Sequence, residues 1–536
     1  MTLFERGGRW GRLLGTAAVV SVLLGTASSA QELLSPYVQV VAAEASSDDV
    51  ISAFYRDTDY RPLWTGDDSS ERRSALFNTL ARAGDHALPT GRYDVVALQA
   101  MLRGALTEGD RARAEIALTR AYLAYARDVK SGALSPKTLD PGIVREIERP
   151  DEGALLVAIA TREPAAVLRD LPPKSLQYAQ LMRAKMALQQ QIAAGGWGPE
   201  VQAKAIVAGD SGPAVVALRD RLVAMGYLGR SASQSFDTTL QSAVQRFQLD
   251  HGLIADGSAY AGTILEVNIG PEARLKSVIV AMERIRWMGD APLGDRHVWV
   301  NEPDFTAKII DHGKITFETR AVIGKNIPDQ HTPEFSDVME HMVINPSWGV
   351  PRSITVKEYL PLLQANPNAV SHLQVIDGRG RVVPRGAVNF AAYSSRTFPF
   401  ALRQPPSDGN ALGKVKFMFP NPYNIYLHDT PAKNLFSNEV RAYSHGCIRL
   451  AEPFEFAYAL LALQSSDPEG EFEKHLLSGR ESLVKLEKVV PVHLVYFTAY
   501  PGAKGQMTYR RDIYGRDALL YRALEEAGVA SVRVQG

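Results

Sequence analysis

The sequence has no excess of charge of either sign, because 59 Lys and Arg residues balance 59 Asp and Glu residues among 536 positions. This balance gives no support for a nucleic-acid partner or for a polybasic attachment to membranes. An acidic substrate would therefore have to meet a local group of basic residues. The content of 46% hydrophobic and 22% charged residues is ordinary for soluble globular protein, and the length predicts several domains.

Long apolar runs are scarce as well. The run from Leu13 to Gly25 is shorter than the roughly 20 apolar residues that a helix needs to cross a bilayer. Three arginines precede it, and Ser28-Ser29-Ala30 supplies small residues that suit signal-peptidase cleavage. We expect residues 1–30 to be an export signal, with no stable membrane span after cleavage; an uncleaved anchor is the alternative.

Cysteine is nearly absent, since Cys447 is the only one in the chain. An internal disulfide is thereby excluded, and a lone thiol in an oxidising compartment is liable to mixed disulfides and to sulfenic acid. Such a thiol is either a reactive group or a buried, inert small hydrophobe. Its neighbours, in the stretch Tyr443-Ser444-His445-Gly446-Cys447-Ile448-Arg449-Leu450, favour the reactive group.

The N-terminal half predicts helices. Residues 31–206 are rich in Ala, Leu and Arg at helical spacing between short Pro and Gly breaks, and they predict a helical scaffold domain without a catalytic constellation. Residues 207–268 begin at a cap-like Gly209-Asp210-Ser211-Gly212 and predict a module of three helices. Residues 269–294 predict a helical connector.

The C-terminal half predicts strands. Residues 295–500 carry β-branched, partly alternating runs and predict a β-rich domain with a mixed sheet or sandwich. Residues 351–412 have a weak strand signal and predict a lid-like insertion, although a surface excursion without function is the alternative. A helix is expected over Glu471–Leu486 and a helical tail over 501–536. The fold class is therefore α+β, in several domains.

Two histidines could activate the thiol of Cys447, whose pKa must fall from about 8.5 for a thiolate nucleophile. His445 stands two residues away, so on an extended backbone both side chains share a face. His428 ends a predicted strand 19 residues upstream (447 − 428) and can meet Cys447 only through the fold. Sequence spacing does not choose between them.

The residues around both histidines resemble the L,D-transpeptidases, whose YkuD-type catalytic domain carries an upstream His and then Ser-His-Gly-Cys. Here these are His428 and Ser444-His445-Gly446-Cys447, with the fifteen residues Asp429 to Tyr443 between them. Trp348-Gly349-Val350-Pro351 also fits the family. The chain is thus similar to cysteine-dependent acyltransferases of the cell wall.

A second resemblance covers residues 207–268, which look like the widespread peptidoglycan-binding domain. The matching positions include Gly226-Tyr227-Leu228, Phe247-Gln248 and Asp256-Gly257. Most of these are core and turn positions, so the match supports the fold of the module better than it supports binding. The order of scaffold, module and catalytic domain resembles the large periplasmic YcbB-like branch, which implies export to the periplasm.

The resemblance implies roles for the site residues. Cys447 would be the nucleophile, His428 the general base oriented by the backbone carbonyl of Asp429, and His445 a secondary site residue. The backbone N–H groups of Gly446 and Cys447 would be oxyanion donors. Further residues expected to contact substrate are Tyr426, Ser444, Arg449 and Trp348.

The implied reaction is acyl transfer on peptidoglycan stem tetrapeptides: a thioester forms, D-Ala leaves, and an acceptor amine takes the acyl group in a cross-link. No metal or other cofactor is expected, and the oligomeric state is not predicted. One alternative is a zinc-dependent peptidoglycan peptidase with ligands among His428, Asp429, His445 and Cys447, but no His-Glu-x-x-His helix is present. The other is a non-catalytic wall-binding scaffold, against which the intact motif argues.

Overall fold

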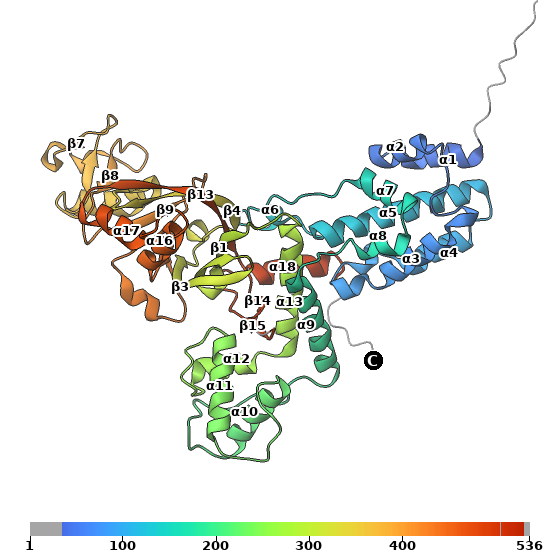
Figure 1. Cartoon of the computed structure of the whole chain (residues 1–536), viewed down its shortest axis with the longest axis horizontal. Helices are drawn as coiled ribbons and strands as arrows, with labels where there is room; N and C mark the ends of the chain where they lie inside the picture. The colour runs from blue at the N-terminus through green and yellow to red at the C-terminus, as the bar shows by residue number, and fades with distance from the viewer. Residues whose placement is uncertain (1–34, 504, 530–536) are drawn as a thin grey trace, which may run out of the picture.

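The computed structural model describes residues 35–503 and 505–529, so the predicted export signal lies outside the described residues. Three lobes meet at a central helix, α13 (Pro271–Met288): a helical arm, a small helical module and a β-rich body (Figure 1). Most residues of α13 are buried, and the helix packs against α9 (Leu176–Ala193) and α18 (Arg516–Glu526). The segment expected to be a connector is therefore the central packing element of the molecule.

The arm is helical, as the sequence predicts. Besides α9 its helices are α1 (Pro36–Ala45), α2 (Asp49–Asp57), α3 (Ser70–Ala81), α4 (Val95–Arg103), α5 (Glu108–Ser131), α6 (Pro136–Leu139), α7 (Glu152–Thr161) and α8 (Pro164–Arg169). Trp64 is fully buried in their shared core. The buried carboxylate of Glu115 accepts hydrogen bonds from the backbone N–H groups of Trp64 at 3.0 Å and Thr65 at 2.8 Å. This aromatic segment is therefore part of the core of the arm.

The module contains the three expected helices around a core of its own. They are α10 (Pro213–Ala224), α11 (Thr238–Asp250) and α12 (Ala261–Asn268). Asp237 caps α11 by accepting a hydrogen bond from the backbone N–H of Leu240 at 2.8 Å. Its carboxylate also accepts a hydrogen bond from the guanidinium of Arg219 in α10 at 2.7 Å. The N-cap of one helix is thus fixed to the neighbouring helix.

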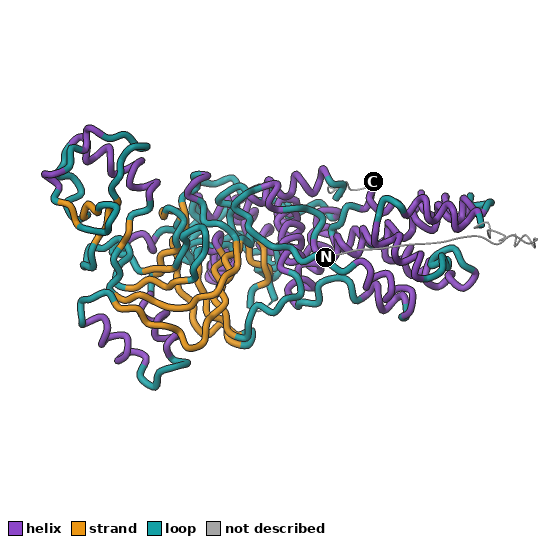
Figure 2. The backbone as a smooth tube through the Cα atoms, turned by 90° about the horizontal axis from the view of Figure 1, so that it is seen from above, coloured by secondary structure: helices purple, strands orange, loops and turns teal. Residues whose placement is uncertain are grey.

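The body is built on a sheet whose strands are paired in the order β11-β3-β12-β10-β9-β4-β13-β1-β2. The strands are β1 (Arg296–Asn301), β2 (Thr306–Asp311), β3 (Lys314–Gly324), β4 (Phe335–Ile344), β9 (Val415–Met418), β10 (Leu427–His428), β11 (Ala442–Ser444), β12 (Ile448–Leu450) and β13 (Ser482–Val495). Since β2 also pairs with β3, the strands from β3 to β2 in this order form a closed sheet, and β11 pairs with β3 beside it. Figure 2 shows these strands gathered beside the helices of the arm.

One side of the central strands carries the main core of the body. Leu427 of β10 and Ile448 of β12 are fully buried and belong to the same cluster as Phe456 and Phe472. The two phenylalanines come from α16 (Pro453–Leu461) and α17 (Pro468–Leu477). Side chains that alternate with Leu427 and Ile448 must point away from this core.

The insertion predicted over 351–412 is a folded subdomain, and it begins at Trp348. Its sheet has the strand order β5-β8-β6-β7. Its elements are β5 (Trp348–Gly349), α14 (Arg352–Ile354), a π-helical turn (Thr355–Tyr359), α15 (Leu360–Ala365), β6 (Gln374–Ile376), β7 (Val382–Val383) and β8 (Ala401–Gln404). It has its own buried core and projects as a separate lobe (Figures 1 and 2). We call this lobe the lid.

Two helical expectations are wrong in part. The helix expected over Glu471–Leu486 ends at Leu477, and β13 begins at Ser482 because it pairs along most of its length with β4. The tail over 501–536 contains α18, but a two-stranded hairpin precedes that helix. The hairpin strands are β14 (Ala499–Pro501) and β15 (Met507–Tyr509).

A buried ionic network joins the arm, α13 and the body. Arg516 of α18, which is 1% exposed, contacts Asp140 at 3.0 Å, Glu302 at 3.2 Å and Glu334 at 3.4 Å. Glu334 also forms a salt bridge with Arg284 of α13. Asp140 follows α6, Glu302 follows β1 and Glu334 precedes β4, so one arginine fixes elements from both large lobes.

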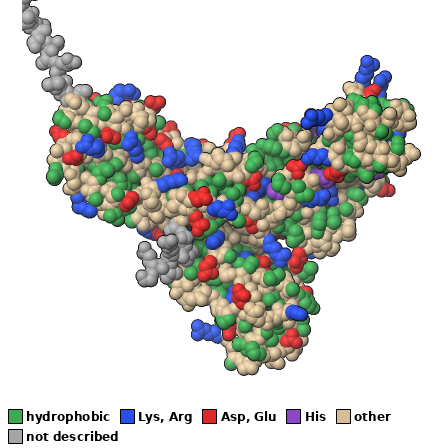
Figure 3. All heavy atoms as spheres, turned by 180° about the vertical axis from the view of Figure 1, so that it is seen from behind, with side chains coloured by type: hydrophobic (Ala, Val, Ile, Leu, Met, Phe, Trp, Pro, Cys, Tyr) green, Lys and Arg blue, Asp and Glu red, His purple; other side chains and the backbone are tan. Residues whose placement is uncertain are grey.

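The surface agrees with the balanced composition. On the face drawn in Figure 3, acidic and basic side chains are interspersed over all three lobes. Across residues 35–503 and 505–529, no helix has both the length and the apolar character needed to cross a membrane.

Candidate active site

The strand register places the predicted nucleophile and base on one face of the sheet. β10 and β12 run parallel, with Leu427 opposite Ile448 and His428 opposite Arg449. Because the first pair is buried against the helices, His428, Arg449 and Cys447 project from the opposite face, toward the lid. Strand geometry separates the Cα atoms of His428 and Cys447 by about 8 Å, which an imidazole and a thiol can bridge together.

The turn before Cys447 is held by Ser444 and Gly446. The hydroxyl of Ser444, a residue that is 2% exposed, accepts from the backbone N–H of Gly446 at 3.1 Å and donates to the carbonyl of Cys447 at 2.5 Å. Gly446 has a φ of +114°, and a Cβ there would lie 3.1 Å from the side chain of Ile425. The position thus requires glycine.

This geometry bears on two expectations from the sequence. The hydroxyl of Ser444 is engaged with the backbone and holds the turn; its contact with substrate stays a prediction. The N–H of Gly446 is also engaged, whereas within the described chain no acceptor is bound to the N–H of Cys447. Of the two expected oxyanion donors, the N–H of Cys447 is the one without an acceptor among the described residues, and the role of both stays a prediction.

His428 is buried and makes the contact that the family resemblance implies. Its Nδ1 lies 2.5 Å from the carbonyl oxygen of Asp429. Burial, followed by the positive charge of Arg449, lowers the pKa of His428 to about 3 in spite of the nearby carbonyls of Asp429 and Leu412. The ring is therefore neutral, and a proton on Nδ1 leaves Nε2 as an acceptor.

The thiol of Cys447 behaves differently from the sequence prediction. Burial raises its pKa to about 11, and the opposing effects of Tyr426, Arg449 and Lys416 do not cancel that cost. The Sγ atom donates to the carbonyl of Asn424 at 3.5 Å. In this state the nucleophile is a neutral thiol beside a neutral imidazole, and no thiolate is stored.

A row of basic residues crosses the sheet at the base, and sequence reasoning missed one of them. His428 lies opposite Lys416 of β9 on one side and opposite Arg449 of β12 on the other. Directly opposed residues share a face, so Lys416, His428 and Arg449 form one row under the lid. Lys416 stands between Val415 and Phe417, which are buried in the core. Because side chains alternate along a strand, this pattern could have shown that Lys416 faces away from the core.

The two cations of this row lack acidic partners. No carboxylate lies within 4 Å of Lys416 or Arg449 among the described residues, and the Nε of Arg449 is buried without a hydrogen bond. Burial lowers the pKa of both groups. The carboxylate of Glu481 and then Cys447 oppose this effect on Lys416, and Cys447 opposes it on Arg449.

The lid meets the body through residues of its π-helical turn. Glu358 Oε1 lies 2.6 Å from Nε2 of His445, and Lys357 Nζ lies 2.7 Å from Asp329 in the loop between β3 and β4. π-helical turns are uncommon and often mark functional positions. His445, two residues from the nucleophile, therefore contacts the lid, whereas His428 is the histidine held within the sheet.

Tyr426 and Trp348 line the same side of the site. Tyr426 packs against both the sheet core and the lid core, with its ring 5.7 Å from that of His428. Its hydroxyl interacts with Cys447 and with Trp348, and burial raises the pKa of Tyr426. Trp348 is 9% exposed and packs edge-on against Tyr359 within the lid. The side chain of Tyr426 thus lines the site, and Trp348 contacts Tyr426 from the lid.

No group of three or more His, Cys, Asp or Glu side chains with the arrangement of a metal site occurs in the described ranges.

Comparison with known proteins gives three family matches and one curated relative. Residues 49–184 match the model of a scaffold domain, 211–263 that of a "Putative peptidoglycan binding domain", and 295–464 that of the L,D-transpeptidase catalytic domain. A "Putative L,D-transpeptidase" of Haemophilus influenzae is 30% identical over 237 residues, covering 44% of this chain and 47% of that protein. The chain thus spans about half the length of this curated relative.

Two solved structures were also found. A crystal structure of an L,D-transpeptidase from Xylanimonas cellulosilytica is 14% identical, covers 55% of this chain and 98% of that one, and has a TM-score of 0.18. That of a fused Zn-dependent amidase/peptidase/peptidoglycan-binding domain-containing protein from Clostridium acetobutylicum is also 14% identical, with coverages of 54% and 99% and a TM-score of 0.16. By its family matches, the chain contains an L,D-transpeptidase catalytic domain and a peptidoglycan-binding domain, as the sequence predicted.

Proposed function

We propose that this chain, an L,D-transpeptidase by its catalytic domain, forms a thioester at Cys447 with a peptidoglycan stem tetrapeptide and transfers the acyl group to an acceptor amine. The observation that supports this most strongly is the common sheet face of Cys447 and His428, with the base buried, neutral and oriented by a backbone carbonyl. Peptidoglycan lies outside the cytoplasm, so the proposal includes export to the periplasm.

The first half-reaction uses the neutral pair. The thiol of Cys447 rotates from Asn424 toward His428, and Nε2 takes its proton as sulfur attacks the carbonyl that precedes the terminal D-Ala. The N–H of Cys447 donates to the oxyanion that forms. His428 then returns the proton to the leaving nitrogen, the C–N bond breaks, and free D-Ala departs from the thioester.

The second half-reaction regenerates the thiol. An amine from another stem attacks the thioester, His428 accepts a proton from that amine, and the C–S bond breaks. The proton passes to the sulfur of Cys447, so that one peptide bond has been lost and one gained. The lid covers the site through the contact of Glu358 with His445, which excludes water and favours the amine over hydrolysis.

The unpartnered cations assign a role to Lys416 and Arg449. A stem tetrapeptide ends in a carboxylate, and two adjacent cations with no carboxylate within 4 Å among the described residues can bind it while also stabilising negative charge on sulfur. The charge of Arg449 is thus paired with substrate and not with a protein acid. Because the chain has no net charge, an acidic substrate needs a local group of basic residues, and this pair supplies one.

The carboxylate contact has a direct test. Lys416→Met and Arg449→Met should raise KM for a free-acid tetrapeptide at least tenfold, because a charge-assisted hydrogen bond contributes roughly 1.5–3 kcal/mol. The same variants should change KM little for the peptide with an amidated C-terminus. Lys414→Met, which removes a lysine paired with Asp408 at 2.6 Å, is the matched control. Equal losses on both peptides would refute the contact.

The overall reaction is tested by incubating purified protein with sacculi and separating the muropeptides by liquid chromatography and mass spectrometry. We expect new cross-links between diamino acids together with released D-Ala, and neither from Cys447→Ala. Activity that persists in Cys447→Ala and disappears with a chelator would instead support a zinc peptidase.

A further inference from the structure

The turn that carries Cys447 is also held from the loop between β3 and β4, by the side chain of Thr332. This residue is fully buried, and its hydroxyl donates to the carbonyl of Gly446 at 2.7 Å. The same hydroxyl accepts from the backbone N–H of Gly324, the last residue of β3, at 3.0 Å. One side chain thus ties the end of β3 to the peptide bond that precedes the nucleophile.

That peptide bond joins Gly446 to Cys447, so the carbonyl of the first and the N–H of the second lie in one plane and point in opposite directions. A hydrogen bond that fixes the carbonyl therefore also fixes the direction of the N–H. It strengthens the N–H as a donor as well, because hydrogen bonds in a chain polarise one another. No group of the described chain accepts from this N–H, so it is available to an oxyanion.

Thr332 is fixed in turn by the segment that leads into α18. The hydroxyl of Tyr514 accepts from the N–H of Thr332 at 3.3 Å and donates to the carbonyl of Gly324 at 2.7 Å. The ring of Tyr514 stacks on His331 with 4.0 Å between the ring centroids. The carbonyl of Thr332 accepts from Arg516 at 3.1 Å. Every polar group of Thr332 is therefore hydrogen-bonded, and two of its partners come from the C-terminal segment.

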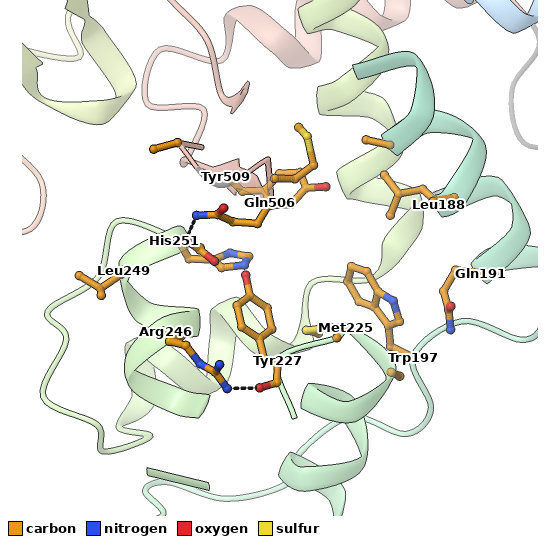
Figure 4. A pocket seen from close by; sticks show the side chains of 17 residues that line it. Leu188, Gln191, Trp197, Met225, Tyr227, Arg246, Leu249, His251, Gln506 and Tyr509 are labelled. Atoms are coloured by element: carbon orange, nitrogen blue, oxygen red, sulfur yellow. Dashed lines mark hydrogen bonds between the residues drawn. The ribbon is translucent and has the colours of Figure 1, made fainter. Parts of the chain in front are cut away.

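This C-terminal segment is itself anchored before it reaches Tyr514. The hairpin of β14 and β15 packs beside the module, where the ring of Tyr509 lies 5.5 Å from that of His251 (Figure 4). The next residue, Arg510, contacts Asp304 of the body at 2.5 Å. Tyr514 follows these contacts and precedes α18, so the chain holds it at both ends.

We propose that Thr332 and Tyr514 are positioning residues for acyl transfer, which direct the N–H of Cys447 toward the oxyanion. Since Thr332 is fully buried, it acts through the peptide that it holds and not by contact with substrate. The role rests on the proposed reaction at Cys447. It adds to that reaction a part of the chain beyond residues 295–464, the range that matches the catalytic-domain model.

Two reactions of Cys447 separate this role from general support of the fold. Acylation by a carbapenem passes through an oxyanion, whereas alkylation by iodoacetamide displaces iodide and forms none. Thr332→Val replaces the hydroxyl by a methyl group of similar size. We expect this variant to slow acylation at saturating carbapenem at least tenfold, since removal of an oxyanion donor costs roughly 100- to 1,000-fold, while the alkylation rate stays within about twofold of the parent. Thr332→Ser keeps the hydroxyl and should restore most of the acylation rate.

A second variant tests the C-terminal segment. Tyr514→Phe keeps the ring on His331 and removes only the hydroxyl, and we expect it to slow acylation severalfold without a change in alkylation. Tyr122→Phe is the matched control, because it removes a buried hydroxyl that donates to the carbonyl of Leu155 in the arm at 3.0 Å. It should leave both rates unchanged. The mass of the intact protein, sampled over time, measures both reactions.

Unchanged acylation in Thr332→Val or in Tyr514→Phe would overturn the proposal. Equal slowing of acylation and alkylation would also overturn it, because that result indicates a site disturbed as a whole. If Thr332→Val fails to fold, Tyr514→Phe decides alone. A parent chain that is alkylated but not acylated would refute the proposed reaction and this role with it, whereas an acylated parent with unaffected variants would refute this role alone.

Discussion

The raised pKa of Cys447 makes the pH dependence of its alkylation unusual. Thiolate is the species that reacts with iodoacetamide, and a thiol with a pKa of about 11 is roughly 0.1% ionised at pH 8. A free cysteine with a pKa of about 8.5 is roughly 24% ionised at that pH. The thiolate population in the folded protein is therefore about 200-fold smaller.

Burial disfavours the charged form of the Cys447 thiol and therefore shifts its ionisation to higher pH. The alkylation rate should rise about tenfold per pH unit from pH 7 to pH 10 without levelling, whereas the protein unfolded in urea should level above pH 9. The shape of this profile separates ionisation from restricted access, which would lower all rates equally.

Mass spectrometry of the intact protein, sampled over time at each pH, measures the rate. Lys416→Met removes one cation that favours the thiolate, so its profile should shift to still higher pH, while Lys414→Met should follow the parent. A profile that levels by pH 8 in the folded protein would refute the account of a stored neutral pair, and would indicate a thiolate paired with His428.

Three further predictions concern the base, the lid and the junction of the lobes. His428→Ala should abolish carbapenem acylation and His445→Ala should only slow it, as followed by mass; the opposite ranking would assign the base to His445. Glu358→Gln should open the lid and shift muropeptide products from cross-links toward hydrolysed tripeptides, and an unchanged ratio would contradict the proposed closure. Arg516→Ala leaves several carboxylates buried without a partner and should lower the free energy of unfolding by about 3–5 kcal/mol in urea titrations, against less than about 1 kcal/mol for the exposed Arg82→Ala. Equal effects of the two arginine variants would contradict a structural role for the network.

The sequence predicts the site where the signal is local or carried by the family motif. The family motif predicts Cys447 and the upstream His428 as the central pair, and the carbonyl of Asp429 contacts Nδ1 of His428 as expected. The three helices of the module also follow from local caps and apolar spacing. These features depend on short stretches of chain.

Features set by tertiary structure were beyond the sequence. Lys416 enters the site through the register of β9 against β10, which no local pattern specifies. The pKa of Cys447 is raised because the fold around it removes water, and spacing alone carries no information on burial. The strand β13 was mistaken for helix at its start because its pairing with β4 overrides the local pattern.

The most direct measurement of the central claim is the intact mass of the protein after incubation with a carbapenem, an acylating agent typical of the resembled family. We expect a single covalent adduct that peptide mapping places on Cys447, with none in Cys447→Ala and none in His428→Ala. An unmodified mass of the folded parent protein, or an adduct that persists in Cys447→Ala, would contradict it.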